Sequence, residues 1–500
     1  MRIAKVLSSV LCLIVLCVTM GGCNQLSIIE AYSRNASNYQ ITAVLNTENK
    51  TLVATQNVEY VNNTGYELSE VRFHLYPNAF SENAKTYKAV SKTQFSQAYP
   101  NGFSEGNIQI NAVQVENSDI QFEIGGADNN ILVVPLSNKL RANDVVSIKI
   151  DFQLLIPNCN HRFGYGQNTI NLGNWYPIAC VFEDEEFKQD GYSSNGDPFY
   201  SDIANYEVSI TYPSDLVVAS TGEKVSTTQE DNNKTDKYIA QAVRDFAMVF
   251  SDKFEIKTQV VNEVQVNYYY YDDANSDSNL KTSVDALVTF NDLIGEYPYK
   301  TLNVVKANFF QGGMEYPNLV YISDNIKVDS EYKNVIIHEI AHQWWYGVVG
   351  NNECEYAWMD EALTEYCTAL FYDRNVGYEV TTREILSNAL NSYMLFCDVY
   401  REVYGELNSS MNRSIYNFDT ETEYVYLTYV KGVLMFDSIA DIIGQNKMEK
   451  FLKEYYKENA MQNVSPKDMV RCLESITTKE MANYIMSWLD GSVVLEELSK

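Results

Sequence analysis

The first half of the chain alternates apolar and polar positions with the two-residue period of a half-buried β-strand. Short runs of this kind, rich in Val, Ile and Tyr, occupy residues 56–61, 71–76, 145–156 and 206–212. Turn-forming residues separate such runs, as in Asn-Asn-Thr-Gly at 62–65 and Gly-Gly at 125–126. The pattern predicts a β-rich domain over residues 39–256, folded as a β-sandwich or a saddle-like antiparallel sheet.

The period changes in the second half of the chain, where apolar residues recur at the spacing of one helix face. Such faces are indicated at 280–294, 448–456, 466–476 and 479–489, with a single extended run at 319–322. We therefore predict that residues 257–500 form a second, mainly helical domain, with a polar loop at 272–279 near the joint. The predicted fold class is α+β, with more than one domain.

The strongest chemical signal lies at residues 338–342, which read His-Glu-Ile-Ala-His inside an apolar stretch typical of a buried helix. Because an α-helix turns once in about 3.6 residues, the imidazoles of His338 and His342 point from one helix face toward one ion. Eighteen residues separate His342 from Glu361, which lies on a second amphipathic stretch. The chain has only four histidines, so composition does not explain this spacing. We predict one catalytic zinc ion per chain, held by these three side chains.

The residue between the two histidines has a separate role in this chemistry. Zinc with an open coordination position lowers the pKa of a bound water to about 7. Glu339 is one residue round the helix from His338, where it can take up a proton and pass it to a leaving amine. Glu339 is therefore the predicted general base and, later in the reaction, the general acid.

Two further segments complete a family pattern. Residues 312–316 read Gly-Gly-Met-Glu-Tyr, and residues 429–432 read Tyr-Val-Lys-Gly. With the zinc motif, they resemble the alanyl aminopeptidase family of gluzincin zinc metallopeptidases, peptidase family M1, in a short two-domain form. The chain departs from the family at Tyr316, where Asn is usual, and at Ala362, where Gly is frequent.

The resemblance implies a thermolysin-like catalytic domain after the β-rich one, and it assigns roles to several residues. The hydroxyl of Tyr429 stabilises the developing oxyanion, and the carboxylate of Glu315 binds the free α-amine of the substrate. Gly312, Gly313 and Met314 form a strand edge that binds the substrate main chain. A second amine-binding residue is expected near 171–177, and Tyr316 is expected to reshape the pocket for the first side chain.

The N-terminus has the features of a secretory signal. Arg2 and Lys5 precede an apolar run from Val6 to Met20, followed by Gly-Gly-Cys at 21–23. Small residues before a cysteine resemble a bacterial lipobox, which would make Cys23 the lipidated first residue of the mature chain. We predict a lipoprotein signal peptide at 1–22, a tether at 23–38 and a lipid-anchored protein of the bacterial cell envelope. The alternative is an ordinary signal peptide and a secreted protein.

Charge and cysteine content limit the partners. The formal net charge is −29, and removal of the signal peptide would also remove the two positive charges of Arg2 and Lys5. The strongly negative mature chain excludes nucleic acid as a partner. The six cysteines beyond Cys23 are scattered without zinc-finger spacing, and they imply no disulfide framework.

These features together predict a zinc metallopeptidase, in the first place an aminopeptidase that releases N-terminal residues from peptides outside the cytoplasmic membrane. A zinc endopeptidase or another zinc hydrolase on the same site stays open, because Tyr316 departs from the family pattern. An inactive peptide-binding lipoprotein is the third possibility, although such a protein would need neither Glu339 nor Tyr429.

Overall fold

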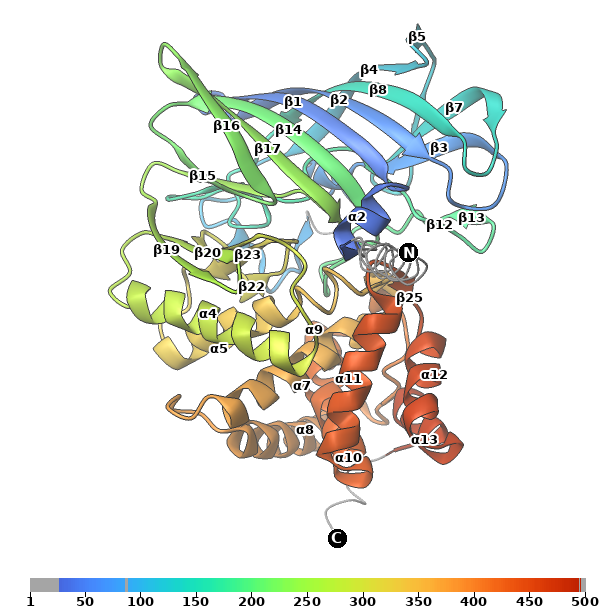
Figure 1. The fold of residues 1–500 in the computed structure, drawn as a ribbon, viewed down its shortest axis with the longest axis vertical. Coiled ribbons are helices and arrows are strands. Elements are labelled where there is room, and N and C mark those ends of the chain that lie inside the picture. The colour runs from blue at the N-terminus through green and yellow to red at the C-terminus, as the bar shows by residue number, and fades with distance from the viewer. Residues whose placement is uncertain (1–26, 86–88, 494, 496–500) are drawn as a thin grey trace, which may run out of the picture.

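The computed structural model describes residues 27–85, 89–493 and 495, so the predicted signal peptide and Cys23 lie outside the described residues. An eight-stranded sheet forms the top of the molecule in Figure 1. Its order is β16 (Glu223–Glu230), β17 (Asn233–Val243), β14 (Ala204–Pro213), β1 (Ser37–Asn46), β2 (Thr51–Val61), β8 (Val145–Leu155), β4 (Asn107–Val115) and β5 (Ser118–Asp119). Strand β2 alternates buried and exposed residues along most of its length, as the two-residue period predicts.

One pair in this sheet departs from the predicted antiparallel arrangement. Strands β1 and β14 are parallel, with Ser37 opposite Ala204, whereas the other neighbouring strands are antiparallel. The connection explains the parallel orientation. Residues 156–203 separate β14 from the preceding strand β8, and a long crossover of this kind, unlike a hairpin, allows parallel pairing.

Two smaller sheets pack with the large one. The first contains β15 (Val217–Ser220), β18 (Met248–Ser251), β10 (Ile170–Leu172) and β9 (Phe163–Tyr165). The second contains β11 (Ile178–Ala179), β3 (Leu68–His74), β7 (Ile131–Leu140) and β6 (Glu123–Gly125). A hairpin of β12 (Phe182–Glu183) and β13 (Glu186–Phe187) leads into the irregular segment 188–203.

The second half of the chain begins with a five-stranded sheet that the sequence pattern largely missed. Its order is β19 (Glu255–Val261), β20 (Val264–Tyr270), β21 (Thr301–Ala307), β23 (Leu319–Ser323) and β22 (Gly313–Met314). Strands β20, β21 and β23 are parallel, and β22 forms the edge, antiparallel to β23. Buried parallel strands lack apolar–polar alternation, so their period does not reveal them.

Helices make up the rest of this half and occupy the lower part of Figure 1. They include α4 (Ser276–Leu293), α5 (Asp329–Ala341), α7 (Trp358–Arg374), α8 (Thr382–Tyr404), α9 (Glu421–Val425), α10 (Lys431–Ile443), α11 (Gln445–Asn459), α12 (Pro466–Ile476) and α13 (Lys479–Leu489). The predicted order of a β-rich domain followed by a mainly helical one is confirmed. Within the described residues, no helix combines the length and apolarity that a membrane span requires.

Arg244 joins the two halves. Its side chain is 2% exposed, and Nε donates to the carbonyl of Tyr346 at 2.7 Å. Nη1 donates to the carbonyl of Ser201 at 3.0 Å, and Nη2 donates to that of Gln462 at 2.8 Å. One buried cation therefore satisfies main-chain oxygens of the segment after α5, the segment before β14 and the segment after α11.

Candidate metal centre

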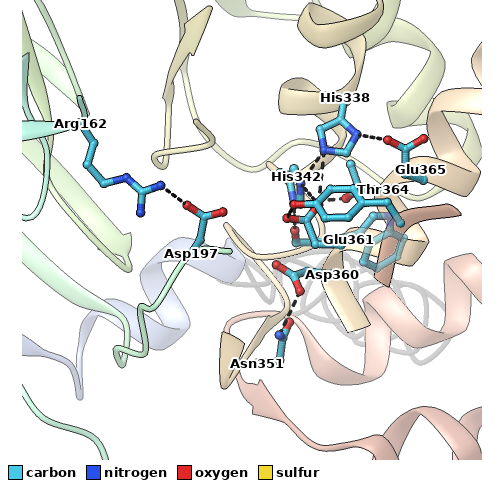
Figure 2. A network of polar contacts seen from close by, with 11 residues as sticks. Arg162, Asp197, His338, His342, Asn351, Asp360, Glu361, Thr364 and Glu365 are labelled. Carbon is cyan, nitrogen blue, oxygen red and sulfur yellow. Dashed lines mark hydrogen bonds and ion pairs between the residues drawn. The ribbon is translucent and has the colours of Figure 1, made fainter. Parts of the chain in front are cut away.

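Helices α5 and α7 bring the three predicted ligands together (Figure 2). His342 caps the C-terminal end of α5, one turn after His338, and Glu361 lies in the first turn of α7. The two Nε2 atoms are 3.1 Å apart, and Oε2 of Glu361 lies 3.2 Å from Nε2 of His342 and 3.4 Å from that of His338. The three ligand atoms thus surround a single point.

These distances fit a zinc ion. Zinc bonds to nitrogen and carboxylate oxygen are about 2.0–2.2 Å long, so tetrahedral ligand atoms are about 3.3–3.5 Å apart. The set of two imidazoles and one carboxylate is also the ligand chemistry of catalytic zinc sites, which keep a fourth position open. Burial raises the pKa of Glu361, but the adjacent His342 and His338 lower it to about 2. The carboxylate is therefore ionised and ready to bind a cation.

Outer contacts orient both imidazoles. Nδ1 of His338 lies 3.1 Å from Oε1 of Glu365, one turn after Glu361 on α7. Nδ1 of His342 lies 2.9 Å from the carbonyl oxygen of Trp345 and 3.2 Å from the hydroxyl of Thr364. Such contacts fix the tautomer that leaves Nε2 for the metal.

Glu339 lies between the metal centre and the edge strand. Its side chain is buried, and Oε2 has no hydrogen-bond partner within the described part of the chain. Burial, with a smaller contribution from Glu361, raises the pKa of Glu339 to about 7 against the opposing effect of the two histidines. A carboxylate with a pKa near neutrality is well matched to proton transfer at neutral pH.

Gly313 lies directly against Glu339. A Cβ atom at position 313 would lie 2.5 Å from Cδ of Glu339, so Gly313→Ala should push the carboxylate away. Displacing a catalytic group by about 1 Å can cost about 10²-fold, and we expect kcat/KM to fall by that order while zinc content is retained. Gly312→Ala is the control, because its Cβ would meet only Cγ2 of Val335 at 3.8 Å. Equal losses in both variants would contradict this account.

Tyr429 reaches the centre from a π-helical turn at 426–430, between α9 and α10. Its hydroxyl donates to Oε1 of Glu361. The other two motif residues, Lys431 and Gly432, have structural roles. The buried Nζ of Lys431 donates to the carbonyl of Ser409 at 2.6 Å, and a Cβ on Gly432 would lie only 3.1 Å from Cα of Ala362. Lys431 and Gly432 thus fix the turn against α7, and Tyr429 alone faces the ligands.

Glu315 follows β22 and lies beside the centre, near His342. It is 3% exposed, and Oε1 has no hydrogen-bond partner among the residues that the structure describes. Carboxylate oxygens of Glu315 and Asp360 and a ring nitrogen of His342 lie within 4.8 Å of one another. Burial, together with the nearby Asp197, raises the pKa of Glu315 well above its usual value. A cationic ligand would relieve this unfavourable burial.

Tyr316 was expected to shape the pocket for the first substrate side chain, but the structure buries it. Its side chain is fully buried, and the hydroxyl donates to Oδ1 of Asn174 at 2.7 Å. Asn174 in turn donates to Asp245 at 2.6 Å. Tyr316 thus packs into the β-rich half and is not open to a substrate, and Asn174, in the expected segment 171–177, supports it.

Asp197 is a candidate residue that no sequence motif indicates. It lies in the irregular segment 188–203, between Arg162 and the metal centre in Figure 2. Oδ1 of Asp197 is 2.7 Å from Nη2 of Arg162, which also donates to Gln311. Gly196, in the left-handed region at φ +61, allows this segment to approach Tyr424 closely. The β-rich half thereby contributes a carboxylate close enough to Glu315 to raise its pKa.

The comparisons with known proteins agree with this geometry. Residues 279–488 match the family model described as the Peptidase family M1 domain. Aminopeptidase B of Rattus norvegicus is 29% identical over 196 residues, which make up 37% of this chain and 29% of that protein. Endoplasmic reticulum aminopeptidase 2 of Bos taurus is 22% identical over 402 residues, 74% of this chain and 41% of that protein. The matches thus span less than half the length of these curated relatives.

A crystal structure of an M1 zinc metallopeptidase from Deinococcus radiodurans shares the fold. It has a TM-score of 0.64 and 15% identity, and the alignment covers 92% of this chain and 95% of that one. A mutant of that protein bound to a Tyr-Ser-Ala substrate also gives a TM-score of 0.64. The fold and the three-ligand centre therefore agree with the match of residues 279–488 to the Peptidase family M1 domain.

Proposed function

We propose that the protein is a zinc-dependent aminopeptidase that releases N-terminal residues from peptides. The observation that carries this proposal is the buried carboxylate of Glu315, whose Oε1 lacks a hydrogen-bond partner among the described residues. Charge-assisted hydrogen bonds to an ammonium group would satisfy it. An acidic pair of Glu315 and Asp197 next to the metal ligands favours a substrate whose free amine ends there. The named relatives are also aminopeptidases.

Each residue of the site has a separate role in the proposed reaction. Zinc supplies Lewis-acid chemistry when bound. The main chain of the substrate pairs with the free edge of β22, which places the scissile bond beside Gly313 and hence beside Glu339. Glu339 accepts a proton from the attacking water and later donates it to the leaving amine. Tyr429 donates its hydroxyl proton in a hydrogen bond to the oxyanion as negative charge develops there.

Replacement of Tyr429 by Phe tests the oxyanion role. Removing one such donor costs about 10²–10³ in rate, so we expect kcat to fall by that factor while zinc content stays at one ion per chain. Tyr426→Phe is the matched control, because Tyr426 lies in the same turn and stacks on Phe396 at 4.5 Å between ring centroids. A rate near that of the parent in Tyr429→Phe would exclude the role.

The function is tested with a panel of aminoacyl aryl amides, each with a free and an acetylated amine, and with the chain from Asn24 onward. Cleavage of the free-amine forms alone supports the aminopeptidase. Cleavage of both forms would favour a zinc endopeptidase or another zinc hydrolase. Zinc binding without cleavage of either form would favour an inactive peptide-binding protein.

We also propose that the protein is an extracytoplasmic protein of the bacterial cell envelope, anchored to the membrane by lipid at Cys23. The proposal rests on the sequence at 1–23, since these residues lie outside the described part of the structure. Expression with a labelled fatty acid tests it: the full chain should take up label, and Cys23→Ser should lose both the label and membrane association. Secretion of the full chain without label would refute the anchor.

A further inference from the structure

Arg162 is a buried cation that lies on the far side of Asp197 from the metal centre (Figure 2). Its side chain is 3% exposed, and the residue immediately precedes β9. Nη2 of Arg162 lies 2.7 Å from Oδ1 of Asp197 and donates to Oε1 of Gln311 at 3.1 Å. Among the residues that the structure describes, Asp197 is the only carboxylate in ion-pair contact with Arg162. One nitrogen atom therefore connects a carboxylate of the β-rich half to the helical half.

The main chain and the guanidinium group of Arg162 are both held in place. The amide of Arg162 donates to Nδ1 of His161 at 2.8 Å, and its carbonyl accepts from the amide of Gly173 at 2.8 Å. The ring centroid of Phe199 lies 4.9 Å from Cζ of Arg162, and Phe199 belongs to the same irregular segment as Asp197. These contacts leave the side chain little rotational freedom, so Arg162 is a fixed point for the carboxylate that it binds.

The contact with Gln311 ties this fixed point to the catalytic half. Gln311 lies two residues before β22, and Glu315 follows that strand directly. The amide of the preceding residue, Phe310, donates to the carbonyl of Asn160 at 3.0 Å. Residues 160–162 thus contact residues 310–311 twice, through the main chain and through the guanidinium group. The position of Arg162 is therefore set relative to the strand that leads to Glu315.

The carboxylate of Asp197 is oriented by this cation. In Figure 2, one oxygen of Asp197 faces Arg162 and the other faces the metal centre. Burial raises the pKa of Asp197, and Arg162 opposes that rise, which favours the charged carboxylate. After burial, Asp197 is also the largest cause of the raised pKa of Glu315. An ammonium group bound by both carboxylates would remove their repulsion.

We propose that Arg162 is a positioning residue for the substrate amine. It does not contact the substrate, but it fixes Asp197 so that the second carboxylate oxygen accepts a hydrogen bond from the ammonium group bound at Glu315. An ammonium group has three protons, so it can donate to both carboxylates at once. This inference rests on the proposed aminopeptidase function. It assigns part of the requirement for a free amine to a buried ion pair at the seam between the two halves.

The test compares two zinc-binding inhibitors of the full chain, an amino acid hydroxamate and the same hydroxamate without its amine. The ratio of their inhibition constants measures recognition of the amine separately from zinc binding and proton transfer. A hydrogen bond to a charged group is worth about 10- to 100-fold in affinity. We expect Arg162→Gln to lower the ratio by about 10-fold and to raise KM for a free-amine aryl amide more than it lowers kcat. Arg141→Gln is the matched control, because Arg141 is exposed and follows β7.

A double-mutant cycle shows whether Arg162 acts through Asp197. Asp197→Asn should lower the ratio by about 10- to 100-fold, and Arg162→Gln should then add nothing, because both changes remove the same contact. Additive losses would overturn the inference. An unchanged ratio in Asp197→Asn, or in Arg162→Gln with zinc bound, would overturn it as well.

Arg162→Lys separates placement from charge and serves if Arg162→Gln does not fold. Lysine keeps the positive charge but lacks the planar fork of donors, so we expect a ratio between those of the parent and Asp197→Asn. A ratio equal to that of the parent would show that charge alone is sufficient, and the positioning role would be wrong. A parent protein that binds both hydroxamates equally would instead refute the amine role of Glu315, and with it the proposed function.

Discussion

Replacement of His342 by Ala is expected to abolish both zinc binding and peptide hydrolysis. Nε2 of His342 lies 3.1 Å from that of His338 and 3.2 Å from Oε2 of Glu361, so its loss removes one of three protein ligands. Metal content is measured on the purified variant, alongside the free-amine aryl amide. Chelation should inactivate the parent protein in the same way, and added zinc should restore the parent but not His342→Ala.

A variant of Glu365 should have a smaller effect, because Glu365 contacts His338 but is not itself one of the three metal ligands. Loss of such an outer contact usually weakens metal binding by about 10–100-fold. Glu365→Gln should therefore bind zinc more weakly than the parent and recover activity at higher zinc concentration. Full zinc occupancy in His342→Ala would show that the centre has been assigned wrongly.

Replacement of Glu339 by Gln should have the second largest effect. The amide keeps the size of the side chain but cannot accept a proton, so we expect kcat to fall by about 10²–10⁴. Zinc content and the affinity for peptides should remain, because Glu339 is not among the three residues that gather at the metal position. Titration calorimetry with an uncleaved peptide separates these two quantities.

Glu331→Gln is the control for this variant, since Glu331 is exposed in the first turn of the same helix. It removes one carboxylate from α5 without touching the centre. Comparable losses in both variants would mean that charge on the helix, rather than proton transfer, explains the effect. Loss of zinc from Glu339→Gln would point to a structural role instead.

Some parts of this molecule could be predicted because a short-range rule places them. The spacing of His338 and His342 is a property of one helix, and Gly432 belongs to a contiguous motif. The bounds of α12 and α13 also coincide with the predicted segments 466–476 and 479–489. In each case the interacting residues are close in sequence, so the pattern contains the necessary information.

Other parts depend on contacts between distant segments. Asp197 lies on an irregular segment without a motif, and only the fold brings it close to Glu315. Glu365 was visible beside Glu361, but its contact with His338 requires the packing of α7 on α5. Strand β21 is nearly all buried, so its period resembles neither an amphipathic strand nor a helix. The burial of Tyr316 likewise follows from Asn174, more than a hundred residues away.

The contacts of Arg244 bear on how the chain folds. Its guanidinium donates to carbonyls on both sides of the seam, so separating the halves would leave a buried cation and several main-chain oxygens without partners. The two halves should therefore lose structure together, in a single cooperative transition rather than one after the other. The helical half expressed alone is accordingly expected not to fold as an autonomous unit, because it would lose the donor that satisfies the carbonyls of Tyr346 and Gln462.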